Sequence, residues 1–114
     1  THNGITNLSI WDIKQTHDGT IWIATDEGLN AYDPETEKFR HYRFEAENVY
    51  SLTDNLVTSL TIDSQGQLWV GTGFGINRYQ ANTDNFFRTN PNIKGTQNIL
   101  SIIKKHTPKT IAPK

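Results

Sequence analysis

The sequence predicts an all-β fold made of two tandem copies of one four-stranded antiparallel unit. Residues 19–39 align with residues 66–86 without a gap, at an offset of 47 residues. Eight of the aligned positions are identical, and three others keep an apolar side chain. The apolar residues form short runs bounded by glycine, proline, aspartate or asparagine, which is typical of short strands joined by tight turns. A repeat of this period indicates a solenoid, a propeller or another array.

The identical positions form a repeat signature that both copies share. It consists of Gly19, Trp22, Thr25, Gly28, Asn30, Tyr32, Thr36 and Phe39 in the first copy, and of Gly66, Trp69, Thr72, Gly75, Asn77, Tyr79, Thr83 and Phe86 in the second. The two tryptophans could serve as stacking platforms for a carbohydrate. Because a ligand site rarely recurs in every unit of an array, we interpret Trp22 and Trp69 as residues that pack one unit against the next.

The first copy contains four expected strands, at residues 8–14, 21–25, 29–32 and 39–44. Ile10 and Ile13 are the expected apolar anchors of the first of these strands. Gly19 supplies the positive φ angle that the following turn needs. Pro34 fixes φ in the turn that precedes the fourth strand.

The second copy follows the same order. Its first strand is expected at residues 56–62 and its fourth at 86–89, with turns at 64–66, 73–75 and 80–84. Residues 99–102 match residues 57–60 at an offset of 42, so a third unit starts there and gives way to a tail. The expected division is residues 1–44 for the first unit, 45–92 for the second, and 93–114 for the first strand of a third repeat and the tail.

The unit length and the apolar pattern together favour a β-propeller. Four strands at a spacing of about 42 residues are the pattern of a propeller blade. We expect Ile21, Ile23 and Leu29 on one face of the first sheet, and Trp22 and Tyr32 on the other. A sheet that is apolar on both faces needs a neighbour on each side. The prediction is therefore a β-propeller fragment of about two blades plus the start of a third.

The repeated motif resembles a known family. Residues 18–32 read D-G-T-I-W-I-A-T-D-E-G-L-N-A-Y and return with substitutions at residues 65–79. This pattern is similar to the two-component regulator propeller repeat, and the likeness covers roughly residues 5–103. The resemblance implies a seven-bladed propeller that forms the periplasmic sensor region of a bacterial hybrid two-component protein, often for carbohydrates. It also implies a transmembrane helix and a histidine kinase that follow the propeller.

Composition excludes several classes of function. The net charge is -1 and there is no cysteine, so nothing favours a nucleic-acid partner, a disulfide framework or a thiol nucleophile. No apolar run reaches the length of about 18 residues that spans a membrane, and we expect no membrane contact by this segment. The four histidines lack metal-ligand spacing, and no nucleophile motif frames a serine. We therefore expect no cofactor, no metal site and no catalytic residue.

Four residues are weak candidates for ligand binding. Trp11 is not part of the repeat, because Thr58 occupies the equivalent position in the second copy. It is therefore the tryptophan that could have an exposed or interface role. Asp12, Ser59 and Ser101 share one position on the first strand of each unit. If that strand is innermost, these three polar side chains line a central channel. Simple solvation of the channel is the less demanding explanation of the pattern.

The leading hypothesis is a fragment of an extracytoplasmic ligand-sensing propeller, not an enzyme in itself, whose full-length protein could be a sensor histidine kinase. The alternatives are part of a propeller enzyme that acts on glycans and a structural protein-interaction propeller. The expected partners are the remaining blades of the propeller and, in the full-length protein, an oligosaccharide. The expected location is the periplasm. Since two blades leave two open apolar faces, we also expect the fragment to form a homo-oligomer.

Overall fold

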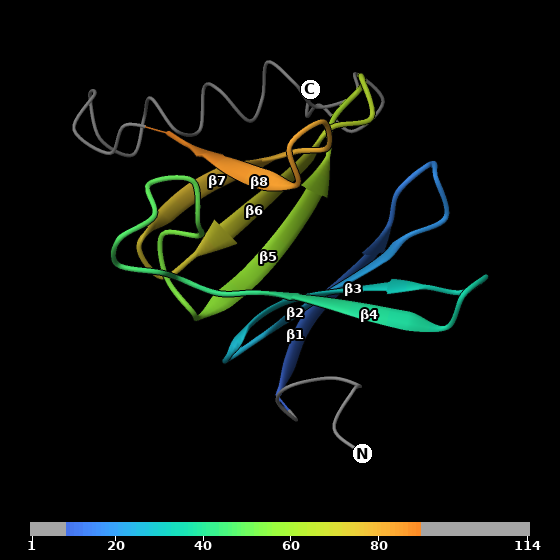
Figure 1. Cartoon of the computed structure of the whole chain (residues 1–114), viewed down its shortest axis with the longest axis horizontal. Helices are drawn as coiled ribbons and strands as arrows, with labels where there is room; N and C mark the ends of the chain where they lie inside the picture. Colours follow the sequence, from blue (N-terminus) through green and yellow to red (C-terminus); the bar gives the residue numbers. More distant parts are fainter. Residues whose placement is uncertain (1–8, 90–114) are drawn as a thin grey trace, which may run out of the picture.

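The structure is a computed structural model that describes residues 9–89. These residues form eight strands and no helix (Figure 1). The strands are β1 (Ile10–Gln15), β2 (Ile21–Thr25), β3 (Gly28–Asp33), β4 (Lys38–Tyr42), β5 (Val57–Ile62), β6 (Leu68–Thr72), β7 (Gly75–Gln80) and β8 (Asn85–Arg88). The expected start of a third unit lies outside the described residues.

The strands form two separate four-stranded sheets in chain order. One sheet has the order β1-β2-β3-β4 and the other β5-β6-β7-β8, and all neighbours are antiparallel. The two sheets pack face to face. They are nearest to each other along β1 and β5 and diverge toward β4 and β8 (Figure 1). The predicted all-β propeller fold, with two four-stranded antiparallel units, is confirmed.

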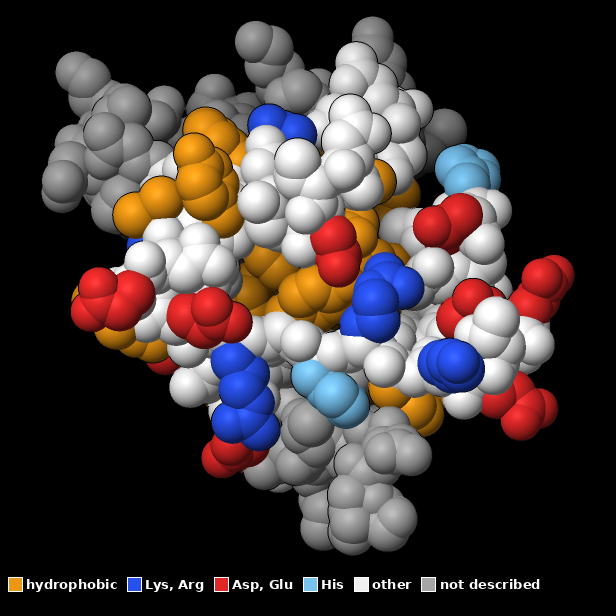
Figure 2. Space-filling model, in the orientation of Figure 1, with side chains coloured by type: hydrophobic (Ala, Val, Ile, Leu, Met, Phe, Trp, Pro, Cys, Tyr) orange, Lys and Arg blue, Asp and Glu red, His pale blue; other side chains and the backbone are white. Residues whose placement is uncertain are grey.

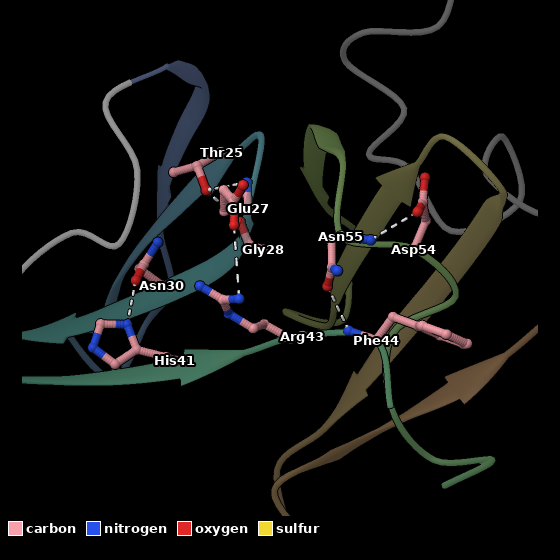
Figure 3. A network of polar contacts seen from close by, with 9 residues as sticks. All are labelled: Thr25, Glu27, Gly28, Asn30, His41, Arg43, Phe44, Asp54 and Asn55. Carbon is pink, nitrogen blue, oxygen red and sulfur yellow. Dashed lines mark hydrogen bonds and ion pairs between the residues drawn. The ribbon is translucent and has the colours of Figure 1, made fainter. Parts of the chain in front are cut away.

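A threonine and a glycine of the signature build the tight turn between the second and third strands. Thr25 pairs with Gly28 across a two-residue turn, and its hydroxyl donates to the Gly28 carbonyl at 2.8 Å. The same hydroxyl accepts the Glu27 amide at 3.1 Å (Figure 3). Gly28 has φ 119, and a Cβ there would meet the Tyr42 carbonyl. Glycine is therefore required by both the backbone angle and the close approach of the neighbouring strand.

This turn also corrects one expectation about the faces of the first sheet. Leu29 pairs with Ala24 and so shares a face with Trp22, whereas Tyr32 pairs with Ile21 and lies on the opposite face. The expectation placed Leu29 with Ile21 and Tyr32 with Trp22, and it is wrong. Residues that are directly opposite in an antiparallel pair lie on one face, so the two-residue turn sets the register.

The core lies between the two sheets, and each sheet contributes a different face to it. The first sheet contributes a face that we name the Trp22 face, and the second contributes its Val70 face. The Trp22 face consists of Trp22, Ala24, Leu29 and Ala31, and the Val70 face of Val57, Leu60, Leu68, Val70 and Phe86. Leu52, from the connection between the sheets, is fully buried in the same cluster.

Equivalent residues of the two copies show how this packing decides burial. Ile10 and Ile13, the apolar anchors expected on the first strand, are 46% and 52% exposed on β1. Their counterparts on β5, Val57 and Leu60, are 0% and 3% exposed. The first pair lies on the face turned away from the second sheet, because Ile13 pairs with Ile23, whereas the second pair faces the first sheet. The interface is therefore head-to-tail, as in a ring of blades.

The two signature tryptophans bury their rings, and each indole N–H finds a partner by a different route. Trp69 donates to the Asp63 carboxylate at 2.8 Å, and the same carboxylate accepts two amides of the β5–β6 turn. Trp22 donates to the Thr16 hydroxyl at 3.0 Å, and Thr16 in turn donates to Asp18. Thr16 and Asp63 are equivalent at the offset of 47 residues. The equivalent turns of the two copies thus bind the indole N–H through different side chains.

Two adjacent phenylalanines on β8 test the assignment of the core. Phe86 is 1% exposed in the interface, and Phe87 is 47% exposed on the other face of the sheet. Truncation of a buried phenylalanine typically costs about 3–5 kcal/mol. We expect Phe86→Ala to lower the free energy of unfolding by that amount in urea titration. Phe87→Ala should change it by about 1 kcal/mol or less, and equal losses in the two variants would contradict the assignment.

Candidate ligand-binding groove

A groove lies between the two blades at the ends of three turns. Its volume is about 630 Å³. The β1–β2 turn forms one wall, and the β5–β6 and β7–β8 turns form the other. The lining residues are Thr16, His17, Asp18, Trp22, Gly66, Gln67, Leu68, Arg78, Tyr79, Gln80, Ala81, Asn82 and Thr83. This volume lies within the range of about 300–1,000 Å³ that is typical of small-molecule sites.

The lining combines apolar surface with polar groups from several turns. Tyr79 supplies accessible apolar carbon, while Gln67 and Asn82 supply amides that can both donate and accept hydrogen bonds. Trp22 is only 2% exposed, so it cannot offer a ring face for stacking. The groove therefore suits a neutral polar ligand that is held by hydrogen bonds at its edges.

Asp18 is the carboxylate of the groove, and its environment favours the ionised form. The Thr20 amide donates to it at 3.0 Å and the Thr16 hydroxyl at 2.8 Å. These hydrogen bonds, with the Thr20 amide first, outweigh partial burial and hold the pKa of Asp18 below its usual value. Asp18 therefore acts as a hydrogen-bond acceptor at neutral pH.

A cluster of aromatic and charged side chains closes the junction of the blades beside the groove. Tyr42 on β4 and Tyr79 on β7 both donate to Asp84 Oδ1, at 2.5 and 2.6 Å. Arg40 donates to the Tyr42 hydroxyl at 2.7 Å and lies 5.9 Å from the Trp22 ring. Figure 2 shows apolar side chains at this junction with acidic and basic side chains next to them. Burial raises the pKa of both tyrosines, so their hydroxyls remain protonated donors.

The candidates from the sequence do not meet in the groove. Trp11 is 56% exposed, and its indole N–H donates to Asp26 Oδ1 at 2.5 Å, away from the groove. Ser59 is exposed on β5, and Ser101 lies outside the described residues. Asp12 and Ser59 occupy the inner strands, but Asp12 is engaged in a contact between the blades.

Asp12 joins the backbones of both blades. Its carboxylate accepts the Leu60 amide of β5 at 2.9 Å and the Ile13 amide at 2.8 Å, and it pairs with Lys14 at 3.1 Å. Burial raises the pKa of Asp12, but the hydrogen bonds from Leu60, Lys14 and Ile13 lower it by more, so the net shift is downward. The carboxylate is thus a structural acceptor, needed where a β-bulge interrupts β1.

Several residues of the site were missed from the sequence. The groove residues belong to turns that could be located in the sequence, but their proximity could not be predicted from it.

Thr53, in the connection, contacts two signature residues: its hydroxyl lies 2.8 Å from Thr72 Oγ1 and accepts Asn77 Nδ2 at 3.0 Å. Its counterpart at the same offset is Thr6, an identity that lies outside the aligned window and outside the described residues. In the first blade, Asn30 instead contacts His41 (Figure 3).

Between residues 9 and 89, no group of three or more histidine, cysteine, aspartate or glutamate side chains could hold a metal ion. Nor does this part of the chain contain a helix that is long and apolar enough to cross a membrane.

Comparison with known proteins identifies the repeat. A family model described as "two component regulator propeller" matches residues 4–27 and residues 51–74. The two matches begin 47 residues apart, which is the offset of the repeat. The resemblance seen in the sequence is confirmed: the family model matches the chain twice, once at each copy of the repeat. Among curated protein sequences, none matches the chain.

A solved structure shares the fold. It is the extracellular domain of a protein assigned as the hybrid two-component system BT3049 from B. thetaiotaomicron. The TM-score is 0.53 at 24% sequence identity, and the match covers 80% of this chain and 19% of that one. The chain thus spans about a fifth of the length of this relative. At this identity the likeness establishes the propeller fold.

The Asp12 contact predicts a dependence of stability on pH. A carboxyl group whose pKa is depressed in the folded state contributes stability above its unfolded pKa, and this contribution is lost as the pH falls through the folded pKa. We expect the melting temperature of the wild type to fall between about pH 5 and pH 2. Asp12→Asn should be less stable at pH 7 and show a shallower fall.

Glu35→Gln, at an exposed turn, is the control and should keep the wild-type profile. Parallel pH profiles of the wild type and Asp12→Asn in thermal melts would show that Asp12 does not stabilise the folded state through its charge.

Proposed function

We propose that this chain is part of an extracytoplasmic ligand-sensing propeller of a hybrid two-component signalling protein. The groove between the blades carries the proposal, because it offers the volume and the hydrogen-bonding groups of a small-molecule site. The propeller repeats and the likeness to the extracellular domain of a hybrid two-component system support the same assignment. In this proposal the chain lies in the periplasm, and the full-length protein supplies the histidine kinase.

The proposed ligand is a carbohydrate. Sugar hydroxyls both donate and accept hydrogen bonds, and they match the amides of Gln67 and Asn82 and the carboxylate of Asp18. Apolar carbon from Tyr79, which is only partly buried, suits the C–H face of a sugar ring. Among the described residues, the groove is lined by one acidic side chain, Asp18, and one arginine, Arg78, so neither sign of charge predominates to select an ionic ligand.

The proposed role is binding without catalysis. Hydrolysis of a glycosidic bond normally uses two carboxyl groups that flank the scissile bond. Asp18 is the one carboxylate among the described residues that line the groove. Its lowered pKa also disfavours a role as a general acid. The groove therefore lacks the pair that an enzyme acting on glycans would need.

We also propose that neighbouring blades cover the outer face of the first sheet. Ile10 and Ile13 are exposed on that face, whereas the equivalent residues of the second sheet are buried by a blade. The neighbour would be another blade of the same ring or, for this fragment alone, a second copy in a homo-oligomer.

Titration with neutral oligosaccharides tests the proposed ligand class. A panel of xylo-, manno- and fructo-oligosaccharides is added to isotopically labelled protein, and amide chemical shifts are recorded. At least one member should shift the amides of residues 16–18, 66–67 and 80–83, and should be recovered intact. Gln67→Ala and Asn82→Ala should each weaken binding by about tenfold, the loss of roughly one buried hydrogen bond.

Glu35→Gln, on a turn that does not line the groove, is the matched control and should bind as the wild type does. Shifts confined to other surfaces would exclude the groove. Turnover of a bound sugar that Asp18→Asn abolishes would show that the chain is an enzyme.

A further inference from the structure

Several of the exposed large apolar side chains lie at one end of the blades and on the connection between the sheets. Nine such residues lie in the described part of the chain, and four of them, Ile10, Trp11, Ile13 and Phe87, lie on strands. The other five lie on the β6–β7 turn or on the connection between the sheets, and Trp11 lies at the start of β1, where its indole contacts Asp26 of the β2–β3 turn. We name this surface the apolar lip: Trp11, Phe44, Val49, Tyr50, Leu56 and Phe74.

The opposite end of the blades differs. It consists of the turns at residues 16–20, 33–37, 63–67 and 80–84 and includes the groove. Among the described residues of these turns, none is an exposed large apolar side chain. Solvent-exposed apolar residues scattered over a surface need no explanation, but their concentration on one side of a molecule marks an interaction surface.

The lip is continuous across both blades. Trp11 donates to Asp26, and the next residue, Glu27, pairs with Arg43 at 3.7 Å. Phe44 then donates its amide to Asn55 at 2.8 Å (Figure 3). From there, the Leu56 carbonyl accepts the Gly73 amide at 3.0 Å, next to Phe74.

The connection that carries the lip is held in place. Arg88 of β8 donates to the Ser51 carbonyl at 2.9 Å and to the Asn48 and Leu52 carbonyls at 3.2 Å. Its guanidinium also lies 5.9 Å from the Phe44 ring. A surface fixed before binding loses less conformational entropy on association.

Trp11 is the anchor that this surface presents. Its indole N–H is already bound by Asp26, so a partner needs to supply only apolar contact to the exposed ring. A tryptophan held in this way matches the aromatic anchors that dominate binding energy at protein interfaces.

The shape and charge of the lip indicate what would bind there. The cavity next to it, lined by Arg43, Glu45 and Tyr50 among others, has a volume of about 90 Å³ and is too small for a sugar. Five carboxylates and Arg43 lie in residues 9–11, 26–27, 43–56 and 73–74, and Arg88 of β8 packs against Phe44. This excess of negative charge disfavours a second copy of the same surface.

We propose that the apolar lip docks a protein surface that has an apolar centre surrounded by lysine or arginine. Aromatic and aliphatic side chains in the centre supply the affinity, and the acidic residues around them select a basic partner. This contact is separate from the groove and does not depend on the ligand that the groove binds.

A library of random peptides displayed on phage tests the proposal. The full chain is immobilised, and peptides are selected and then measured against variants. Enriched peptides should combine Trp, Phe or Leu with Lys or Arg. Phe74→Ser should weaken them by about tenfold or more, as expected for an interface anchor. Phe87→Ser, the same substitution on a strand face, should leave binding unchanged. Added salt should weaken the binding of the peptides to the wild-type chain.

Three outcomes would overturn the proposal. The first is a selection that enriches no peptide sensitive to Phe74→Ser. The second is an enriched set without net positive charge. The third is a dimer in sedimentation equilibrium that Phe74→Ser dissociates, which would assign the lip to a second copy of the chain. Circular dichroism of Phe74→Ser confirms that the variant is folded, since Phe74 is 75% exposed.

Discussion

The packing of the Trp22 face against the Val70 face is the interaction on which the rest of the structure depends. Each sheet alone would expose one of these apolar faces to water. Complete burial of a large apolar side chain contributes about 1.5–3 kcal/mol, and Trp22, Leu29, Val70 and Phe86 are all nearly or fully buried between the sheets. The interface also determines where the groove lies, since the groove opens where the turns of the two packed sheets diverge.

Polar contacts fix the angle and register that the apolar contacts leave open. The Asp12 carboxylate accepts amides from both inner strands, and Asp84 accepts hydroxyls from both outer halves of the blades. These contacts lie at opposite edges of the sheets. A rotation of one blade relative to the other would break at least one of these contacts. Loss of the Asp12 contact would leave a partly buried carboxylate with fewer partners, which is costly. The pair of contacts thus positions the walls of the groove.

Much of the fold could be predicted from the sequence because the repeat encodes it twice. Glycines such as Gly28 and apolar runs located the strands and turns, and two copies separated the signature from chance. The faces of Leu29 and Tyr32 were wrong because the period of two residues was continued through a two-residue turn. Ile10 and Ile13 were expected as apolar anchors, but whether such residues are buried depends on whether a blade covers them and not on their sequence pattern.

The groove could not be predicted from the sequence, for a different reason. Residues such as Asp18, Gln67 and Asn82 lie in three turns that approach one another only when the blades pack. No spacing between residues in the sequence indicates that these three turns lie close together. Asp12 was noticed for its repeated position, but its contact with Leu60 required the relative placement of two strands. Predictions that rest on local pattern therefore held for elements, and they failed for contacts between blades.

The central claim is that the two sheets are one cooperative unit held by their shared interface. Native-state amide hydrogen exchange tests it most directly, because it measures the free energy of opening at each strand. The slowest amides of β2 and β3 should share one opening free energy with those of β6 and β7, and Phe86→Ala should lower all of them together. Opening of β6 and β7 at a clearly lower free energy than β2 and β3, with Phe86→Ala affecting the second sheet alone, would contradict the claim.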